Sequence, residues 1–555
     1  MNPLSRIAGR AVDRAIGLPA AAAPYVLRRN VGVPMPDGVV LLGDHYRPAE
    51  HDRPLPVVLI RSPYGRAALA GILFAAPLAR RGFQVFIQST RGTFGSGGLF
   101  RPFMSEREDG LATVAWVRDQ PWCDGRVSMT GGSYLGHTQW AVAPYVDPPL
   151  RSVSLNITAA KMTAAFYHHG APGIRNALTW TGLIGTQERG GLRGVPNPRQ
   201  MARTRRALRK IPLQAADVDV AGAPVAFWRD FIGHSSPGDE FWAGADHDRA
   251  DLTRLPPVSM VTGWWDLFLA EQLRDYAAIR AAGVTARITV GPWLHGEPGE
   301  LRAIMQQDFA WLDHYLADGP PPPGAPVRVF LQRAGTWLDL EEWPPPAAVG
   351  TAYYLRVSGA LSQEAEPGDA PPDTFVYNPA DPTPTVGGPL LQPPGKQADN
   401  TTIEARPDVL TYTTEPFSAD QDLVGPVRAR IFVRTGRQYA DLFVRICDVD
   451  LDGVSRNVAD GIRRLSPQTV PAPDVQAGDD GILAVDLELY PTAYRVLAGH
   501  RIRVQISGGA FPRFARNLGT AEPFGAAIRA VRCKFDIYYD SRHPAYVLLP
   551  VLPPL

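Results

Sequence analysis

Short hydrophobic runs that alternate with amphipathic segments dominate the first third of the chain. The runs rich in β-branched and aromatic residues, which are typical of strands buried on both faces of a parallel sheet, are at residues 56–60, 83–87 and 126–130. Helical spacing of apolar positions predicts helices at residues 67–80, 108–118 and 134–142. A Pro-Asp-Gly turn at residues 36–38 predicts a hairpin before the first run. Alternating strands and helices indicate a doubly wound α/β sheet.

This pattern stops and later returns. Strand-like runs at residues 258–262 and 286–290 flank a predicted helix at 269–282, so the sheet resumes there. Residues 156–250 between the two blocks have helical periodicity, many arginines and little strand character. We interpret them as an inserted helical cap that would roof the site.

From about residue 351 the character of the chain changes to short alternating strands, such as residues 427–433 and 501–506. Turn signals about every ten residues are typical of an all-β sandwich or jelly roll. The sequence therefore predicts an α/β core, a cap and a C-terminal jelly roll. The expected limits are 1–155 and 251–345 for the two parts of the core, 156–250 for the cap and 346–555 for the jelly roll.

Composition is consistent with several folded domains. The chain has 555 residues, which is too long for one hydrophobic core, since single cores stop growing near ~250–300 residues. Its net charge is +1, and its basic and acidic residues are scattered along the chain without a basic patch. We therefore expect a small-molecule partner and no nucleic acid. No apolar run reaches the ~18 residues of a membrane span. The three widely spaced cysteines predict reduced thiols and a cytoplasmic location.

The strongest local signal is a strand that runs into small residues, a serine and a helix. Residues 131–136 read GGSYLG, with Ser133 at the centre. A serine on such a sharp turn has its hydroxyl above the carboxyl edge of the sheet, as in the nucleophile elbow of α/β-hydrolases. Leu135 takes the place of the second glycine of the usual motif, and Gly136 comes one residue later. This motif alone leaves a glycine-rich turn with a capping serine as an alternative.

Two further residues decide between these readings. Asp266 ends one late predicted strand and His295 ends the next, which gives the order Ser, Asp, His of an α/β-hydrolase. In that role His295 removes the Ser133 proton during attack on a carbonyl, and Asp266 holds the imidazole in the right tautomer. Each partner is a weak signal singly, but three elements in order at strand ends predict a serine hydrolase.

An oxyanion hole needs two donors, and the usual HGGG segment is absent. One donor is expected to be the backbone N–H of Tyr134, the residue after the nucleophile. The other candidate is the hydroxyl of Tyr64, which follows an early central strand. The alternative for Tyr64 is a packing aromatic with its hydroxyl at the surface.

Taken together, the motifs resemble those of the cocaine esterase (CocE/NonD) family of serine hydrolases, which is related to X-Pro dipeptidyl-peptidases and α-amino-acid ester hydrolases. The matching segments are SPY at 62–64, TRG at 90–92, QPWCDGRV at 120–127, GGSYLG at 131–136, GWWD at 263–266, GPWLH at 291–295, NPADP at 378–382 and FPRF at 511–514. The family's elbow also has tyrosine after the serine and a delayed glycine. The resemblance implies an α/β-hydrolase core, a helical cap, a C-terminal jelly roll and a tyrosine hydroxyl in the oxyanion hole at Tyr64. It implies no cofactor, and no histidine, cysteine or carboxylate spacing predicts a metal site.

The acyl group is expected to be neutral and hydrophobic. Related enzymes that act on free α-amino groups place carboxylates just after the catalytic aspartate, whereas here Leu267 to Ala270 are apolar. An unpaired ammonium against such a wall would be costly. By resemblance, Phe268 would line the acyl pocket. The cap residues Phe166 and Trp180 are expected beside it, although core packing is the alternative for all three.

The function predicted is therefore hydrolysis of a small carboxylic ester through an acyl-serine intermediate. An X-Pro dipeptidyl-peptidase, an amidase or an α-amino-acid ester hydrolase with the same triad stays open as an alternative. A second alternative is a non-catalytic protein whose jelly roll recognises a polymer. The oligomeric state has no sequence signal, and a homodimer is kept as one candidate assembly.

Overall fold

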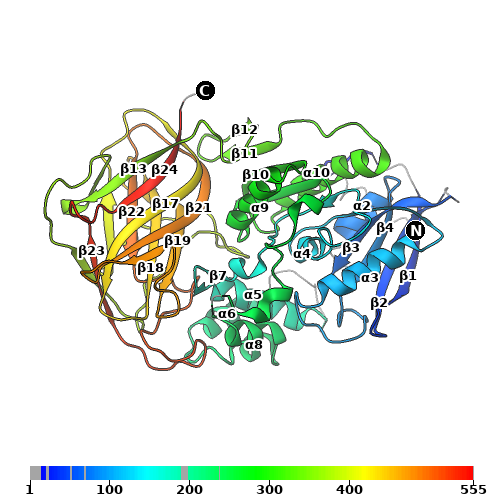
Figure 1. The fold of residues 1–555 in the computed structure, drawn as a ribbon, viewed down its shortest axis with the longest axis horizontal. Coiled ribbons are helices and arrows are strands. Elements are labelled where there is room, and N and C mark those ends of the chain that lie inside the picture. The colour runs from blue at the N-terminus through cyan, green and yellow to red at the C-terminus, as the bar shows by residue number, and fades with distance from the viewer. Residues whose placement is uncertain are drawn as a thin grey trace.

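A computed structural model describes residues 14, 16–20, 24–49, 53–67, 71–188, 198–236 and 238–553. These residues form three parts, which Figure 1 shows in one view. An α/β part lies at the N-terminal end, a β domain lies at the opposite end, and a group of helices lies beside the junction of the two.

One mixed sheet forms the centre of the α/β part, and ten of the described strands build it. In spatial order they are β1 (Tyr25–Pro34), β2 (Val40–Pro48), β4 (Gln84–Ser89), β3 (Leu55–Ser62), β5 (Cys123–Met129), β6 (Val153–Ser154), β9 (Val258–Trp265), β10 (Ala286–Leu294), β11 (Val327–Leu331) and β12 (Thr336–Leu340). Strands β4 to β11 pair in parallel, while β1, β2 and β12 are antiparallel to their neighbours. Every residue of β9 is buried, which explains why the central strands are continuous apolar runs.

Helices cover both faces of this sheet. They are α2 (Ala76–Ala79), which follows a π-helical turn at Gly71–Ala75, α3 (Glu106–Arg118), α4 (Tyr134–Trp140), α9 (Leu269–Ala281) and α10 (Pro298–Ala317). Helices α3 and α9 pack with one set of strand residues, and α2 and α10 pack with the alternate set. The helix predicted at 67–80 is thus shorter and partly π-helical, and residues 68–70 lie outside the described residues. Helix α10, which the sequence reasoning did not predict, covers the sheet with Ile304, Met305, Leu312 and Leu316.

Helices are the main elements among the described residues of 156–250, in line with the periodicity of this segment. Their elements are 3₁₀ turns at Met162–Ala165 and Glu240–Gly244, the short strands β7 (Tyr167–His168) and β8 (Ala171–Pro172), and helices α5 (Ile174–Thr186), α6 (Pro198–Leu208), α7 (Ala216–Ala221) and α8 (Ala226–Gly233). A 3₁₀ turn at Leu252–Arg254 leads back to β9. We call this helical region the cap. Its aromatic core also includes residues from the α/β part, so the cap is packed onto the edge of the sheet.

The C-terminal part is a mainly antiparallel β domain, in which β14 and β16 are the one parallel pair among its described strands. Its elements are β13 (Val349–Arg356), a 3₁₀ turn (Val357–Gly359), β14 (Ala360–Ser362), β15 (Asp373–Tyr377), α11 (Thr401–Glu404), β16 (Val409–Thr413), β17 (Gln421–Thr435), β18 (Ala440–Val449), β19 (Ser455–Leu465), β20 (Val475–Ala477), β21 (Leu483–Val496), β22 (Arg501–Ser507), β23 (Cys533–Tyr538) and β24 (Tyr546–Leu552). Strands β17 and β21 are longer than the short strands that the sequence predicts. Alternate residues along much of β17 are buried in the hydrophobic core of the β domain.

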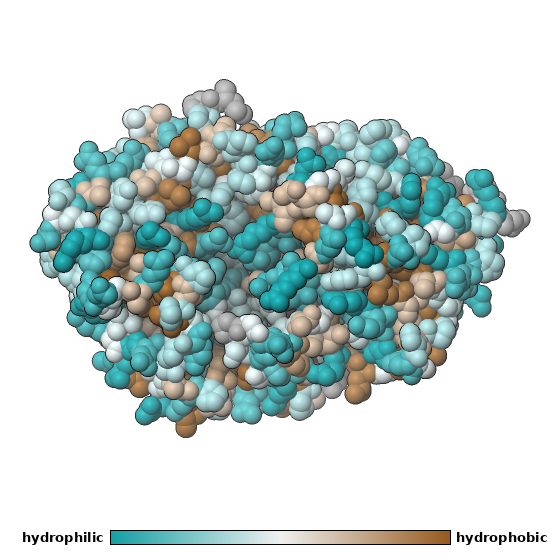
Figure 2. All heavy atoms as spheres, in the orientation of Figure 1, coloured by the Kyte–Doolittle hydropathy of each residue, from teal (hydrophilic) through white to brown (hydrophobic). Residues whose placement is uncertain are grey.

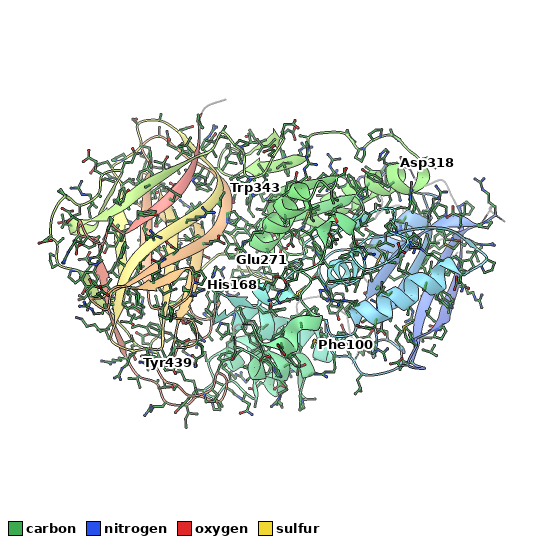
Figure 3. All side chains as sticks on the ribbon, in the orientation of Figure 1. Phe100, His168, Glu271, Asp318, Trp343 and Tyr439 are labelled. Atoms are coloured by element: carbon green, nitrogen blue, oxygen red, sulfur yellow. The ribbon has the colours of Figure 1, made fainter. Side chains whose placement is uncertain are left out.

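A crevice of about 810 Å³ lies where the three parts meet. Among its lining residues are Glu271 of α9, His168 of the cap and Tyr490 of β21. Figure 3 labels His168 and Glu271 near the centre of the molecule, and Figure 2 shows the surface hollowed there. The side chain of Leu267 lines both this crevice and a smaller cavity at the carboxyl edge of the sheet.

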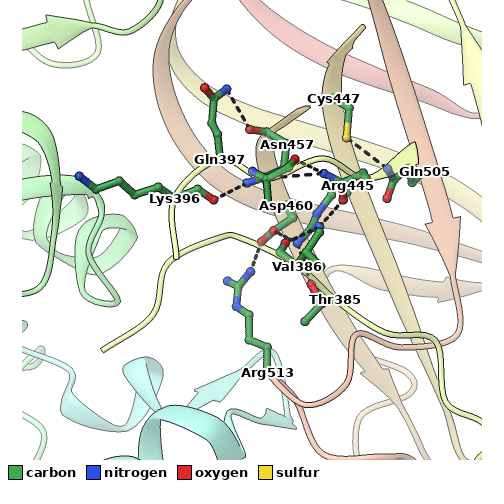
Figure 4. A network of polar contacts seen from close by, with 12 residues as sticks. Thr385, Val386, Lys396, Gln397, Arg445, Cys447, Asn457, Asp460, Gln505 and Arg513 are labelled. Carbon is green, nitrogen blue, oxygen red and sulfur yellow. Dashed lines mark hydrogen bonds and ion pairs between the residues drawn. The ribbon is translucent and has the colours of Figure 1, made fainter. Parts of the chain in front are cut away.

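A buried network of charged residues holds the β domain together (Figure 4). Asp460 of β19 lies between two arginines: Oδ2 accepts from Arg445 Nη2 at 2.9 Å, and Oδ1 accepts from Arg513 Nη1 at 2.6 Å. All three side chains are buried. Burial alone would raise the pKa of Asp460, but the two guanidinium groups outweigh it and hold that pKa below its usual value.

We predict that Asp460→Asn destabilises the protein by about 3–5 kcal/mol, because it leaves buried guanidinium charge without its counterion. The urea-unfolding midpoint measures the effect. Asp486→Asn is the matched control, since Asp486 also binds an arginine, Arg430, with two hydrogen bonds but is 42% exposed. Such an exposed pair contributes at most about 1 kcal/mol.

The pH dependence gives a second readout of the same pair. Because the folded pKa of Asp460 is lowered, its contribution is present above the unfolded pKa and is lost as the pH falls through the folded value. The wild-type protein should therefore lose more stability on acidification than Asp460→Asn does. Equal loss of stability in the Asp460 and Asp486 variants at neutral pH would contradict the prediction.

Candidate active site

Ser133 lies between the end of β5 and the start of α4, in a backbone conformation that serine rarely adopts. Its φ is 61° and its ψ is −126°, and the preceding Gly131 has a φ of 129°. The Ser133 N–H donates to the Asn156 carbonyl oxygen at 3.0 Å, which ties the turn to the segment after β6. This is the strained strand-to-helix turn of a nucleophile elbow.

Close packing explains why the second glycine of the motif is displaced. A Cβ at Gly136 would lie 2.6 Å from Thr158 Cγ2, and a Cβ at Gly132 would lie 2.8 Å from Ile157 Cγ1. The turn before α4 at Gly132 and the first turn of α4 at Gly136 therefore both lie close to the segment after β6. Leu135 points into the core against the sheet, where a side chain is required. The glycine is needed where the helix meets its neighbour, which is one residue later than in the usual motif.

The structure brings the three residues of the predicted triad together. His295 Nε2 lies 3.0 Å from Ser133 Oγ, and His295 Nδ1 lies 2.6 Å from Asp266 Oδ2. Asp266 is fully buried, whereas the His295 side chain is 9% exposed. With its proton on Nδ1, the imidazole donates to Asp266, and Nε2 can accept the proton of Ser133. Each of the three follows a parallel strand: Ser133 comes after β5, Asp266 after β9 and His295 after β10.

Asp266 accepts a backbone hydrogen bond and lies near another buried carboxyl group. Its other oxygen, Oδ1, accepts from the Phe268 N–H at 2.7 Å. Glu300, in the first turn of α10, is also fully buried and accepts from the Gly296 N–H at 2.6 Å. Burial, together with the nearby charge of Asp266, raises the pKa of Glu300 well above its usual value. Glu300 therefore binds a proton more readily than an exposed glutamate does.

A second buried carboxyl supports the elbow from behind. Asp308 of α10 accepts from Thr130 Oγ1 at 2.6 Å and from Asn156 Nδ2 at 3.0 Å. Burial raises the pKa of Asp308 to about 6, although these hydrogen bonds oppose the rise. Asn156 also accepts from the Ser133 N–H through its backbone, so this network fixes the position of the nucleophile's main chain.

Both predicted oxyanion donors lie beside Ser133. The Tyr134 side chain points away from the site, since its hydroxyl donates to Glu106 Oε1 at 2.8 Å and accepts from the Phe103 N–H at 2.9 Å. This leaves its backbone N–H, at the start of α4, as the group near the nucleophile. Tyr64 lines the cavity with Ser133, and its hydroxyl accepts from Trp180 Nε1 at 3.1 Å.

The cavity over Ser133 is small and apolar. Its volume is about 30 Å³, room for one or two waters, so an acyl group requires lining side chains to move. The lining residues are Tyr64, Phe103, Ser133, Tyr134, Met162, Phe166, Asn176, Trp180, Leu267, Phe268 and Leu391. The candidate pocket residues Phe166, Trp180 and Phe268 are thus together in it. Among these described lining residues there is no carboxylate.

Sequence reasoning missed several residues that support the site. No local sequence pattern marks the supporting residues Glu106, Glu300 and Asp308 or the hydrogen bond from Trp180 to Tyr64. These contacts join side chains that are distant in the chain. Within the part of the chain that the structure describes, no group of three or more His, Cys, Asp or Glu side chains is arranged to hold a metal ion. Over the same residues, no helix has the length and apolar character needed to cross a membrane.

Two protein-family models match the chain. Residues 37–297 match the X-Pro dipeptidyl-peptidase (S15 family), and residues 323–546 match the X-Pro dipeptidyl-peptidase C-terminal non-catalytic domain. The cocaine esterase of Rhodococcus sp. (strain MB1 Bresler) is 32% identical over 580 residues, which cover 95% of this chain and 99% of the relative.

Solved structures share the fold over almost the full length. An α-amino acid ester hydrolase is 24% identical with a TM-score of 0.77, and the match covers 96% of this chain and 98% of that chain. An aminopeptidase from the marine sediment archaeon Thaumarchaeota archaeon is 23% identical with a TM-score of 0.78 and the same coverage, 96% and 98%. At these identities the likeness shows the fold alone.

The tight packing at Gly136 predicts the effect of one added methyl group. Gly136→Ala should destabilise the protein by about 1–3 kcal/mol, because the methyl group must displace Thr158. It should also lower kcat, by as much as about 10²-fold if Ser133 moves by ~1 Å. Thermal unfolding and ester-hydrolysis kinetics measure the two effects.

Gly233 at the end of α8 provides the matched control, since no atom lies within 4 Å of the Cβ that alanine would add there. Gly233→Ala should be neutral or should stabilise by up to about 1 kcal/mol. A Gly136→Ala enzyme with unchanged kcat and stability would show that the close approach of α4 to β6 is not required.

Proposed function

Since the chain belongs to the cocaine esterase-like (CocE/NonD) family of serine hydrolases, within the X-Pro dipeptidyl-peptidase superfamily, we propose that Ser133, His295 and Asp266 carry out its ester hydrolysis. The observation that carries this assignment is the continuous chain of hydrogen-bond distances from Ser133 Oγ through the imidazole to Asp266. The same chain of contacts is what an activated serine nucleophile needs.

In the proposed reaction Ser133 Oγ attacks the ester carbonyl carbon while His295 Nε2 takes its proton. Asp266 stabilises the imidazolium that forms. The tetrahedral intermediate collapses as His295 gives the proton to the leaving alkoxide, which departs as an alcohol. A water then attacks the acyl-serine, His295 acts as its base, and the carboxylic acid is released with Ser133 restored. The negative oxygen of each tetrahedral intermediate is bound by the Tyr134 N–H and the Tyr64 hydroxyl.

The acyl group is proposed to be neutral and hydrophobic. The support is the chemistry of the cavity, in which Phe166, Trp180 and Phe268 surround Ser133 and no lining side chain is acidic. A substrate ammonium would lose its hydration there without gaining a counterion. Leu267 and Phe268, which directly follow Asp266, are apolar and line this cavity.

The substrate of such an esterase is a small molecule, and the finer predictions on partners remain proposals. They are a homodimer, a cytoplasmic location and no binding of nucleic acid. Analytical ultracentrifugation of the purified protein tests the homodimer, for which a monomer at micromolar concentration is the contrary result.

Tyr64→Phe should lower kcat by about 10²–10³-fold with little change in KM, because an oxyanion donor acts mainly in the transition state. Steady-state kinetics on a neutral ester measures it. Tyr167→Phe is the matched control, since the Tyr167 hydroxyl donates to the Phe231 carbonyl at 2.5 Å within the cap. A loss below threefold in Tyr64→Phe would remove Tyr64 from the oxyanion hole.

A pair of substrates of nearly equal size tests the acyl preference. The p-nitrophenyl ester of phenylacetic acid should have a kcat/KM at least about tenfold above that of the p-nitrophenyl ester of phenylglycine. The second ester differs by an α-ammonium group, which must lose its hydration in the apolar cavity. An X-Pro p-nitroanilide tests the peptidase alternative, and Ser133→Ala gives the background rate. Preference for the amide with a free N-terminus would overturn the proposed substrate class.

A further inference from the structure

We infer that Trp180 is a positioning residue for the oxyanion hole: its indole N–H directs the hydrogen of the Tyr64 hydroxyl away from the cap and toward the reacting carbonyl oxygen. This inference rests on the proposed function, in which Tyr64 is an oxyanion donor. It assigns to Trp180 a role beyond contact with the acyl group.

The geometry follows from what each group can donate. Trp180 Nε1 lies 3.1 Å from the Tyr64 hydroxyl oxygen, and an indole N–H can only donate. The phenol oxygen therefore accepts from Trp180, and the single hydrogen of Tyr64 cannot point along that line. Tyr64 and Ser133 line the same cavity. The directions left to this hydrogen include the cavity over Ser133, where the substrate carbonyl would lie in the proposed reaction.

The direction of the indole is fixed by the aromatic core of the cap. Trp180 is on α5, and its ring is stacked on Phe103 with centroids 5.3 Å apart. Phe227 of α8 meets it edge to face at 4.6 Å. Only 7% of Trp180 is exposed, so its ring cannot turn without disturbing these neighbours. The hydrogen bond to Tyr64 therefore crosses from the cap to the loop after β3 with a defined direction.

This contact strengthens Tyr64 as a donor when the transition state needs it. A hydroxyl that accepts one hydrogen bond becomes a better donor of the next, since bonds in a chain polarise one another. Burial raises the pKa of Tyr64 to about 12, against the effect of its hydrogen bonds with Trp180 and Ser133, so the phenol keeps its proton at neutral pH. A substrate oxygen that gains negative charge would then complete a chain from indole to phenol to oxyanion.

A double-mutant cycle separates this role from simple lining of the cavity. Trp180→Phe removes the N–H and should lower kcat on a neutral ester about 3- to 10-fold, the value of one hydrogen bond. In a Tyr64→Phe background the same change should alter kcat less than about twofold, because no hydroxyl remains to be directed. Loss of ring volume acts in both backgrounds and is removed by the comparison.

Two further variants test whether the fall in kcat comes from loss of the Trp180 N–H. Replacement of Trp180 by benzothienylalanine keeps the ring shape but lacks the N–H, so it should reproduce the fall in kcat with little change in KM. Trp242→Phe is the matched control in the cap, since Trp242 is 6% exposed and its indole donates to the His234 carbonyl at 2.8 Å. It should leave kcat within about twofold, because a lost cap hydrogen bond affects stability rather than Tyr64.

The outcomes are distinguishable. Equal losses for the Trp180 change with and without the Tyr64 hydroxyl would overturn the inference and leave the proposed function intact. A Tyr64→Phe enzyme with near-normal kcat would remove the premise, and the inference would fall with it. Full activity of the benzothienylalanine enzyme would also overturn it, even if Trp180→Phe were impaired.

Discussion

The hydrogen bond between Ser133 and His295 depends on one constraint, which is that parallel strands end at the same edge of a sheet. Strands β5, β9 and β10 run in parallel, and Asp266 and His295 are each the first residue after their strand. Tyr64 follows the parallel strand β3 in the same way. Register and strand direction thus bring together Ser133 and His295, which are 162 positions apart, and no long side-chain reach is needed. The α/β architecture itself positions the chemistry.

The strained turn at Ser133 is held in place by close packing and by hydrogen bonds to buried carboxyl groups of α10. The positive φ of Ser133 places its hydroxyl above the sheet, and the glycines at 132 and 136 permit the close packing that holds this conformation. Helix α10 supplies both buried carboxyl groups. Asp308 binds the segments on either side of the elbow, and Glu300 holds the loop after His295 through the Gly296 N–H. Burial and the charge of Asp266 raise the pKa of Glu300, so the protonated form of Glu300 is favoured at this position.

The sequence predicted those parts of the molecule that depend on local pattern or chain order. The central strands, the cap and the residues Ser133, Asp266 and His295 follow from periodicity and from the order of motifs. Strand β6 has only two residues, too few to show a period, and α10 was missed although its apolar residues recur with helical spacing. Contacts such as Trp180 with Tyr64 could not be predicted, because they join residues 116 positions apart through the packing of two separate parts. The displaced glycine became explicable only from its contact with Thr158.

Catalysis and selectivity have different structural origins in this arrangement. The three residues of the proposed triad all come from the α/β part, whereas the cavity wall also includes Phe166 and Trp180 of the cap and Leu391 of the β domain. Leu391 is held by a hydrogen bond from its N–H to Asn176 Oδ1 at 3.0 Å, so the cap and the β domain are joined at the cavity itself. Since the cavity is too small for an acyl group, binding must shift side chains at this junction. The free energy of fitting a given acyl group is therefore set by contacts between the three parts, and changes at their interfaces can alter the substrate range without touching Ser133, His295 or Asp266.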